Sequence, residues 1–459
     1  MSARRRKLSP VSNSWYKGLH VEGMQLPEPT ITALCFFNQA PSKDVIVQEF
    51  EKHIWSLDRF SSVVQNGCWV KEEKPMDVEY HFSRKEVANE AEIDAYAQDA
   101  MSKPLDRSKP MWTVTVLAAR QGRSALVLRV HHCIGDGLGL LFAFFPMMKI
   151  EAGDVRDKIP LPAVLLGKRS ERTEAQPGLV SRICSMIFGC PKRMCTAGRG
   201  ALSLLIVPYD SEIKINPPQQ QRKPFLPYSG RQTFTRMTPV PMPLIKEVRA
   251  KHGCTVNDAI MSCLSGAIRR YCAQELQDPL CQQSSSQRLD CKCTMLMAMP
   301  RPVDPSDPSR SLCNRILTPL FKLPVGEKEP ALRLQKSMEM SADLKQIPFI
   351  AGISATTKFV SAIAPDGLAR KLASEALSKL TCNVTCLPMS TVPVKSLGHE
   401  IQELQVLFVN NIPQVSLMTY NGTLHWNIIC DPQLVPDPAA IGRHFLAEMQ
   451  DLAAGAAME

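Results

Sequence analysis

The sequence predicts a mixed α/β protein made of two halves, and three observations carry this prediction. The chain has 459 residues, more than the roughly 100 to 200 residues of one ordinary domain. Strand patterns and helical patterns occur in both its first and its last third. Between them, Lys214 to Pro227 contains four prolines and three successive glutamines, which favour an extended connection. We therefore expect an N-terminal half at 1–178, a crossover and linker at 179–231, and a C-terminal half at 232–459.

The first half contains a predicted strand pair followed by a helix. Two runs, Trp112 to Val116 and Ser124 to Val130, are rich in β-branched and aliphatic residues, and Gln121-Gly122 between them is typical of a turn. The apolar residues after Gly137 indicate the beginning of a helix. The residues between 130 and 137 are therefore expected to lie where a strand leaves its sheet.

The second half is also mixed. Polar residues at Thr255 to Asp258 precede apolar residues at helical spacing, so a helix is expected to begin at Asn257 or Asp258. Strands are predicted at Val406 to Val409 and at Val415 to Tyr420, with a turn at Asn421-Gly422. By composition, loops are expected at 281–287 and 302–309.

The composition is that of a globular protein with a basic surface. Hydrophobic residues make up 44% of the chain and charged residues 21%, enough to build large cores. The net charge of +10 would suit nucleic acid, an anionic membrane or an anionic cofactor. Nucleic acid is disfavoured because the basic residues are not interleaved with aromatic stacking platforms.

Cysteine usage indicates a reducing compartment. The chain has 16 cysteines, and no secretory signal follows Met1, so we expect free thiols rather than disulfides. Cys291 with Cys293, and Cys382 with Cys386, lack the paired C-x-x-C spacing of a structural zinc site. We predict that the protein binds no metal.

Membrane association is expected to be peripheral. The best apolar run, Leu138 to Met148, is shorter than the roughly 20 residues that a spanning helix needs, and it contains a proline. Residues 179–207 mix apolar blocks with arginine and lysine, a composition that suits a lipid surface. A cationic segment crossing over core strands explains the same pattern equally well.

The most informative stretch is HHCIGDG, residues 131–137, at the end of the predicted strand. Adjacent strand residues point to opposite faces, so His131 and His132 cannot both reach one cavity or chelate one metal. The glycines do not have the G-x-G-x-x-G spacing of a dinucleotide turn, and Asp136 would repel a pyrophosphate. What remains is one histidine acting as a general base on a glycine-rich turn that Asp136 orients.

The same residues carry a resemblance. His131-His132-x-x-x-Asp136-Gly137 resembles the HHxxxDG signature of the acyl-CoA-dependent acyltransferase superfamily that includes chloramphenicol acetyltransferase. Leu105 to Trp112, LDRSKPMW, resembles the LDRSRPLW segment of the wax ester synthase/acyl-CoA:diacylglycerol acyltransferase family. Further matches to that family are Leu8-Ser9-Pro10, Arg59-Phe60, Thr255 to Asp258 and Ser416 to Asp431.

The chain departs from the family pattern at one place. Cys382 to Pro388 reads CNVTCLP where the family usually reads SNVPGP, so a proline and a glycine are replaced by Thr385 and Cys386. We expect a reshaped tight turn here that narrows the acceptor channel. The late DFGWG segment of plant-type alcohol acyltransferases is absent from the sequence, which counts against that branch.

The resemblance implies a fold of two chloramphenicol-acetyltransferase-like halves around a central tunnel, with substrates entering from opposite mouths. It implies an O-acyltransferase that moves a fatty acyl group from acyl-CoA, a co-substrate, to a long-chain alcohol or diacylglycerol, with no bound cofactor and no covalent intermediate. His132 would be the base, His131 and Asp136 would support it, and Gly137 would allow the turn. Asn257 is a candidate polar group near the reacting atoms; a helix N-cap is its alternative role.

Two other functions stay open from the sequence. One is an HHxxxDG enzyme with a soluble acceptor, and the other is a catalytically silent lipid-binding protein of the same fold. If the protein is the O-acyltransferase that the resemblance implies, we expect a peripheral location on the cytosolic face of the endoplasmic reticulum membrane or on lipid droplets.

Overall fold

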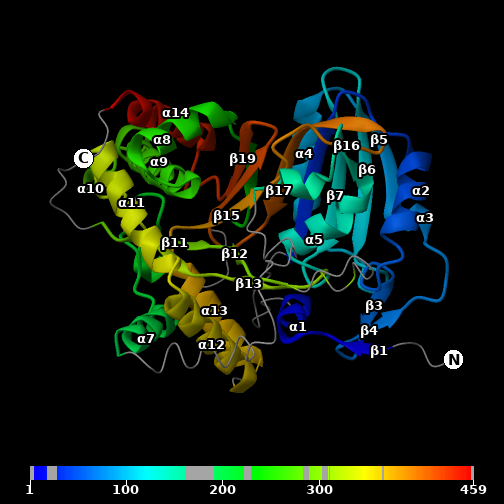
Figure 1. Ribbon diagram of the computed structural model, residues 1–459, viewed down its shortest axis with the longest axis horizontal. Helices are drawn as coiled ribbons and strands as arrows, with labels where there is room; N and C mark the ends of the chain where they lie inside the picture. Colours follow the sequence, from blue (N-terminus) through cyan, green and yellow to red (C-terminus); the bar gives the residue numbers. More distant parts are fainter. Residues whose placement is uncertain are drawn as a thin grey trace.

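The computed structural model describes residues 5–17, 28–160, 191–221, 229–282, 289–301, 309, 311–363 and 366–455. Two seven-stranded sheets, each accompanied by helices, lie in two halves of the molecule (Figure 1). The predicted mixed α/β class is confirmed. Two smaller sheets complete the fold: β1-β4-β3 near the N-terminus, and β12-β13 between the halves. Their strands are β1 Arg5–Lys7, β3 Ser62–Gln65, β4 Cys68–Lys71, β12 Met297–Ala298 and β13 Ile316–Leu317.

The first large sheet has the order β5-β6-β7-β2-β17-β16-β8. The predicted hairpin is confirmed as β6 Trp112–Ala119 and β7 Ser124–His131, and β2 Thr30–Phe37 pairs antiparallel with the other edge of β7. Trp112 is fully buried, and its ring stacks on that of Phe50 in α2. The other elements of this half are α1 Pro10–Lys17, α2 Lys43–His53, α3 Val78–His81, β5 Phe82–Val87, α4 Glu90–Met101, α5 Gly137–Phe144 and β8 Met148–Lys149.

Two strands from late in the chain complete this first sheet. β17 His399–Phe408 pairs antiparallel with β2, and β16 Lys395–Ser396 joins β17 to β8. In Figure 1 these orange strands lie among the blue and cyan strands of the first half. The two halves of the sequence are therefore not separate in space, because the second half contributes strands to the sheet of the first.

The second large sheet has the order β10-β19-β18-β15-β11-β14, with β9 also paired to β19. Its central hairpin turns at Asn421 and Gly422, both with positive φ, as the sequence predicts. Four helices pack together beside this sheet (Figure 1). The strands are β9 Thr233–Arg236, β10 Val240–Pro241, β11 Cys291–Met295, β14 Leu320–Leu323, β15 Cys382–Pro388, β18 Gln414–Tyr420 and β19 Thr423–Cys430. The helices are α8 Met242–His252, α9 Val256–Arg270, α11 Pro330–Leu344 and α14 Pro438–Ala454, with the short α10 Pro279–Gln282 after α9.

The prediction of a tight turn at Thr385 and Cys386 is wrong. Both residues lie in β15, which runs parallel to β11 on one side and to β18 on the other. The physical reason is that Val384 and Thr385 are β-branched and that the segment from Asn383 to Pro388 is paired along its length with β18, which leaves no room for a reversal. Thr385, Cys386 and Leu387 line the cavity described below, and the expected narrowing of an acceptor channel stays a prediction.

A third group of helices lies at one end of the molecule: α7 Pro191–Leu205, α12 Ile347–Ile363 and α13 Asp366–Ser378 (Figure 1). Of the predicted lipid-surface segment 179–207, residues 179–190 lie outside the described residues, and 191–205 form α7. Among the residues that the structure describes, no helix combines the length and the apolar character needed to cross a bilayer.

Candidate active site

The HHCIGDG residues form the link between strand β7 and helix α5. β7 ends at His131, and α5 begins at Gly137 after Asp136, the N-cap. One carboxylate oxygen of Asp136 accepts a hydrogen bond from the backbone N–H of Gly139 at 2.8 Å. The capping bond fixes the end of the turn, because it satisfies one of the backbone donors that a helix start leaves open.

Close packing, rather than backbone conformation, explains two glycines near this turn. A Cβ on Gly139 would lie 2.9 Å from Nη1 of Arg301 and 3.0 Å from the carbonyl oxygen of Cys313. A Cβ on Gly135 would lie 2.9 Å from Leu312. Gly137, which we expected to allow the turn, does not have positive φ, and a Cβ there would only touch Leu387 at 3.7 Å. The structure therefore does not support that role for Gly137.

His131 and His132 point to different surroundings. The Nε2 atom of His131 lies 3.5 Å from a carboxylate oxygen of Glu28, and its Nδ1 accepts from the N–H of Cys133 at 3.2 Å. The hydrogen bond from His131, together with the ion pair to Arg107, lowers the pKa of Glu28 to about 2. Burial lowers the pKa of His131. His131 thus anchors the end of β7 to the Glu28–Arg107 pair.

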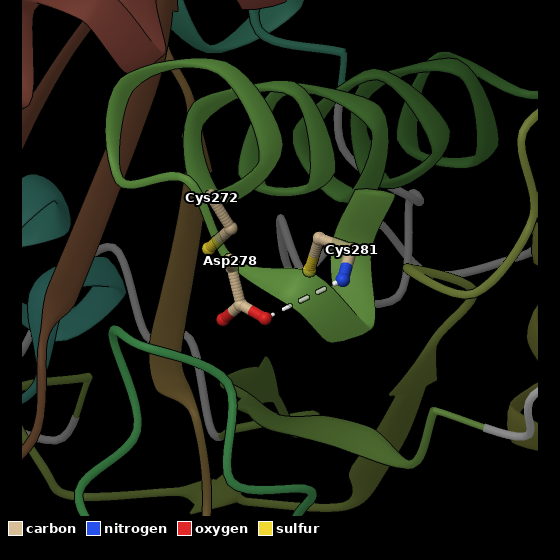
Figure 2. A group of neighbouring side chains, drawn as sticks. All are labelled: Cys272, Asp278 and Cys281. Atoms are coloured by element: carbon tan, nitrogen blue, oxygen red, sulfur yellow. Dashed lines mark hydrogen bonds between the residues drawn. The ribbon is translucent and has the colours of Figure 1, made fainter. Parts of the chain in front are cut away.

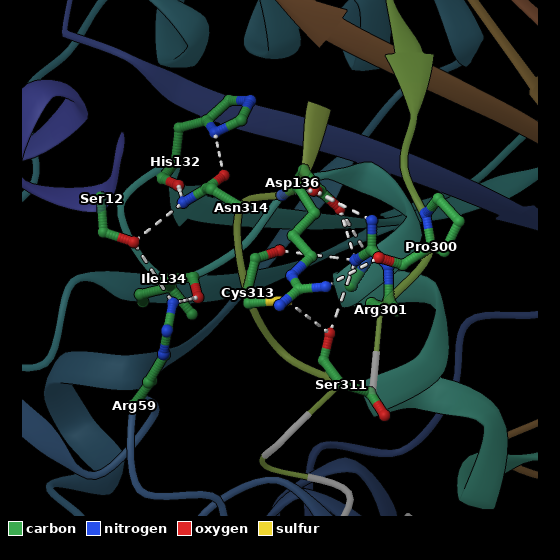
Figure 3. Close-up of polar contacts among 12 residues, drawn as sticks. Ser12, Arg59, His132, Ile134, Asp136, Pro300, Arg301, Ser311, Cys313 and Asn314 are labelled. Atoms are coloured by element: carbon green, nitrogen blue, oxygen red, sulfur yellow. Dashed lines mark hydrogen bonds and ion pairs between the residues drawn. The ribbon is translucent and has the colours of Figure 1, made fainter. Parts of the chain in front are cut away.

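His132 faces a cavity and is held by Asn314. Its Nδ1 lies 3.0 Å from Oδ1 of Asn314, whose Nδ2 donates to the backbone carbonyl of His132 at 2.8 Å (Figure 3). The ring of Trp15 stacks on the imidazole with centroids 4.3 Å apart, and Phe408 meets it edge-on at 5.3 Å. The imidazole therefore has one fixed orientation.

The Asn314 contact also fixes the tautomer of His132. Because the amide nitrogen of Asn314 donates to a carbonyl, its oxygen is the atom directed at the imidazole, and an oxygen can only accept from Nδ1–H. The proton therefore sits on Nδ1 and leaves the lone pair on Nε2. Burial lowers the pKa of His132 to about 4, so the ring is neutral at pH 7. A neutral imidazole with a free Nε2 is the form that a general base requires.

A buried ion pair holds the rest of the turn. Arg301 donates from Nη1 to one oxygen of Asp136 at 2.8 Å and from Nη2 to the other at 3.0 Å, and the backbone N–H of Arg315 donates to the same carboxylate at 2.7 Å (Figure 3). Both ionic side chains are almost completely buried. Arg301 and Arg315, which belong to the second half of the sequence, therefore fix the turn that carries His132.

Arg59 supports the turn from another side. Its Nη1 donates to the carbonyl of Ile134 at 2.8 Å, and Ser12 lies between it and Asn314 (Figure 3). Burial lowers the pKa of Arg59 to about 10, which still leaves the guanidinium charged at pH 7. The Arg59-Phe60 match found in the sequence thus corresponds to a residue that contacts the turn after His132.

The structure does not bring Asn257 to this site. Its side chain is exposed on α9, and it is not one of the residues that line the cavity. The helix starts one residue earlier than predicted, because Thr255 is the N-cap and forms a capping box with Asp258. The polar residues of this segment therefore serve the helix start, and the amide next to His132 comes from Asn314 instead.

A cavity of about 1150 Å³ lies next to His132 between the halves. Much of its wall is apolar, with side chains from β2 and β7 of the first sheet and from β15 and β18 of the second. Exposed lining residues include Lys7 and Lys17 at β1 and α1, Asn66 after β3, Thr318 after β13, and Thr357 and Leu372 at α12 and α13. The volume and the apolar wall suit long hydrocarbon chains.

Within the part of the chain that the structure describes, one cluster of side chains of the types that bind metals lies away from this site. Cys272, Asp278 and Cys281 are buried with their ligand atoms within 4.8 Å of one another (Figure 2). The carboxylate of Asp278 already accepts from the backbone N–H groups of Leu280 and Cys281 and from that of Lys214. Its oxygens cap a helix and a loop, and the hydrogen bond with the Cys281 thiol, together with burial, raises the pKa of Cys272. These residues fit a structural cluster better than a metal site.

Two domain families match the chain. The wax ester synthase/diacylglycerol acyltransferase catalytic domain matches residues 44–260, and the C-terminal domain of the same enzymes matches residues 312–453. The chain belongs to this family. Wax ester synthase/diacylglycerol acyltransferase 4 of Arabidopsis thaliana is 24% identical over 253 residues, which are 50% of this chain and 46% of that protein. The O-acyltransferase WSD of Acinetobacter baylyi is 25% identical over 217 residues, 45% of this chain and 46% of that protein. The chain spans less than half the length of the curated relatives it matches.

Solved structures of this fold agree with the family. The wax ester synthase/diacylglycerol acyltransferase from Marinobacter aquaeolei VT8 superposes with a TM-score of 0.63 at 17% identity, covering 98% of this chain and 100% of that one. The starter condensation domain of rhizomide synthetase, in complex with C8-CoA, gives a TM-score of 0.57 at 12% identity and covers 99% and 96%. The predicted fold of two chloramphenicol-acetyltransferase-like halves is confirmed.

The sequence analysis missed three residues at this candidate site. Asn314 and Arg301 lie 182 and 165 positions from their partners His132 and Asp136, and Trp15 comes from α1. The sequence held one signal for Arg301: a buried carboxylate in the motif requires a cation from somewhere else in the chain. For Asn314 and Trp15 the motif itself gave no such signal.

Proposed function

We propose that this chain is an acyl-CoA-dependent O-acyltransferase that moves a fatty acyl group to a long-chain alcohol, to diacylglycerol, or to both. The observation that carries the proposal is His132, held as a neutral tautomer with Nε2 free beside an apolar cavity. Family membership supports the same chemistry.

In the proposed reaction Nε2 of His132 takes the proton of the acceptor hydroxyl while the hydroxyl oxygen attacks the thioester carbonyl. The tetrahedral intermediate then collapses, the C–S bond breaks, and the imidazolium returns the proton to the departing CoA thiolate. Asn314 Oδ1 and the face of Trp15 both stabilise the transient imidazolium, and so does the charge of Asp136. No covalent acyl-enzyme is needed, and every proton is accounted for by one histidine.

The shape of the cavity supports two different substrates. Lys7 and Lys17 stand at the end near α1, where positive charge suits the phosphates of CoA, and the rhizomide synthetase neighbour is described as bound to C8-CoA. Apolar residues predominate at the end near α13 and suit a lipid acceptor. We place the acyl-CoA at the first end and the acceptor at the second.

A lipid acceptor requires contact with the phase that dissolves it. We therefore propose peripheral attachment to the cytosolic face of the endoplasmic reticulum membrane or to lipid droplets, supported by the basic net charge of +10. The protein would use no bound cofactor and no metal, with acyl-CoA as co-substrate.

The test is to incubate purified protein and its His132→Ala variant with labelled acyl-CoA and an equimolar mixture of fatty alcohol and diacylglycerol. Labelled wax ester or triacylglycerol from the wild type but not from the variant supports the proposal. Transfer to a water-soluble alcohol alone would point to a soluble-acceptor enzyme. Acyl-CoA binding without any product would point to a catalytically silent lipid-binding protein.

A further inference from the structure

Exposed apolar side chains gather on one group of helices. Of the ten large hydrophobic residues that are exposed among the described part of the chain, seven lie on α7, on the residue that follows it, on α12 or on α13. We call these seven the three-helix face: Met194, Leu202, Ile206, Ile347, Phe359, Leu368 and Leu372. Figure 1 shows the three helices together at one end of the molecule. The side chain of Phe359 is 63% exposed and that of Ile206 is 69% exposed. Such large apolar side chains are seldom gathered on a surface that contacts only water.

The face is built rather than accidental, because two of its helices are packed through glycine. A Cβ on Gly200 of α7 would lie 2.2 Å from the carbonyl oxygen of Phe349 in α12, and a Cβ on Gly352 would lie 2.0 Å from that of Ala197. No other residue type allows the two backbones to approach so closely. This contact holds α7 against α12, and the apolar side chains of both helices that belong to the three-helix face are exposed.

The composition of the helices suits a lipid surface. α12 has one charged residue, Lys358, in 17 positions, although helices at a water-facing surface ordinarily have a polar side. The three helices together contain six basic and two acidic residues. Excess positive charge beside exposed apolar groups matches the anionic headgroups and acyl chains of a membrane.

The face is continuous with the cavity that contains His132. Leu372 is 48% exposed and also lines that cavity, and Ala376 and Leu377 line it one turn further along α13. A lipid that leaves a membrane at this face therefore meets apolar wall without crossing water.

We propose that the three-helix face lies in the interfacial layer of an anionic membrane and that the lipid acceptor enters the cavity past Leu372. The entry route of the acceptor rests on the proposed function, while the membrane contact does not. A second copy of this chain is a poorer occupant, since both faces would bring the same excess of positive charge.

The test compares one triple variant with a matched control. Leu202→Gln, Phe359→Gln and Leu368→Gln remove apolar surface from the face, and none of these residues lines the cavity. The control replaces two exposed hydrophobic residues elsewhere, Val45→Gln and Leu332→Gln. Flotation with phosphatidylcholine vesicles, with and without phosphatidylserine, measures binding. We expect the triple variant to lose vesicle binding about tenfold or more, the control to bind like the wild type, and phosphatidylserine to strengthen binding.

A second readout separates the two proposals. Transfer to diacylglycerol in vesicles should fall with binding in the triple variant, and transfer to a short, water-soluble alcohol should stay within about twofold. Vesicle binding by the wild type without transfer to any acceptor would overturn the proposed function and leave the face as a membrane contact. Equal flotation of the triple variant and the wild type would overturn the proposal that the three-helix face binds the membrane. A dimer that becomes a monomer in the triple variant, with flotation unchanged, would assign the face to a second copy.

Discussion

Two buried arginine–carboxylate pairs in this molecule have the same chemistry and different tasks. Asp136 with Arg301 joins the turn that carries His132 to the second half of the sequence, and the backbone of Arg315 adds a hydrogen bond. Glu448 with Arg333 joins α14 to α11 within the second half, and Arg270 of α9 adds a contact to Glu448 at 2.6 Å. Both pairs are almost completely buried. The difference teaches that burial and charge alone do not mark a functional site; what distinguishes Asp136 is that it shares a five-residue turn with His132.

The largest effect is expected at His132, which lies on the same turn as Asp136. His132→Ala removes the base and should lower turnover roughly 10² to 10⁴-fold while the protein stays folded. The measurement is turnover with saturating acyl-CoA, alongside circular dichroism of both proteins. Retention of more than about a tenth of wild-type turnover would contradict the role of His132.

The two pairs can then be broken one at a time. Asp136→Asn and Glu448→Gln each leave a buried arginine without its counter-charge, so each should lower the free energy of unfolding by about 3 to 5 kcal/mol. Asp136→Asn should also lower kcat/KM of the folded fraction, whereas Glu448→Gln should leave it within about twofold. Urea unfolding and initial rates measure the two quantities.

Either of two results would break this comparison. An inactive Asp136→Asn variant with unchanged stability would move Asp136 into the chemistry itself. A loss of kcat/KM in folded Glu448→Gln equal to that of Asp136→Asn would show that the pair beside the catalytic turn is not special.

Much of the fold was predictable because its signals are local. The β6–β7 hairpin, the start of α5 and the Asn421-Gly422 turn each depend on residues a few positions apart. The pairing of β17 with β2 was not predictable in this way, since the strand pattern at Val406 to Val409 does not specify its partner. Strand propensity states that a segment will pair, and tertiary packing decides with which sheet.

The candidate site also has one part that the sequence predicts and one part that it does not. His132 and its opposite orientation to His131 follow from strand geometry, but the partners that fix its tautomer and its turn are Asn314 and Arg301, far away in the sequence. The error at Asn257 arose because a polar N-terminal helix segment has the same composition whether it caps the helix or faces a substrate. The error at Thr385 arose because we extended a turn from the family pattern to residues that favour a strand.

A smaller effect is expected in the cavity wall. Because Thr385 is paired with Ser416 of β18, a proline there would disturb the sheet, and Cys386→Gly is the better probe of the wall. Removing this side chain should shift the ratio of wax ester to triacylglycerol several-fold, since a change of one methylene group is worth about 1 to 3 kcal/mol in a pocket. Cys291→Gly, a buried strand cysteine that does not line the cavity, is the control. An equal ratio in both variants and the wild type would exclude Cys386 from the acceptor path.

The most direct test of the account is the pH dependence of kcat/KM in the wild type and in Asn314→Asp. Because burial lowers the pKa of His132 to about 4, the neutral base persists down to that pH, and the wild-type rate should fall only as the pH drops through about 4. A carboxylate at position 314 would favour the imidazolium and raise this pKa, so the acid limb of the variant should move to higher pH. Tryptophan fluorescence at each pH checks that both proteins stay folded. An upward shift is the predicted result, and identical acid limbs in the two proteins would contradict His132 as the base that Asn314 holds.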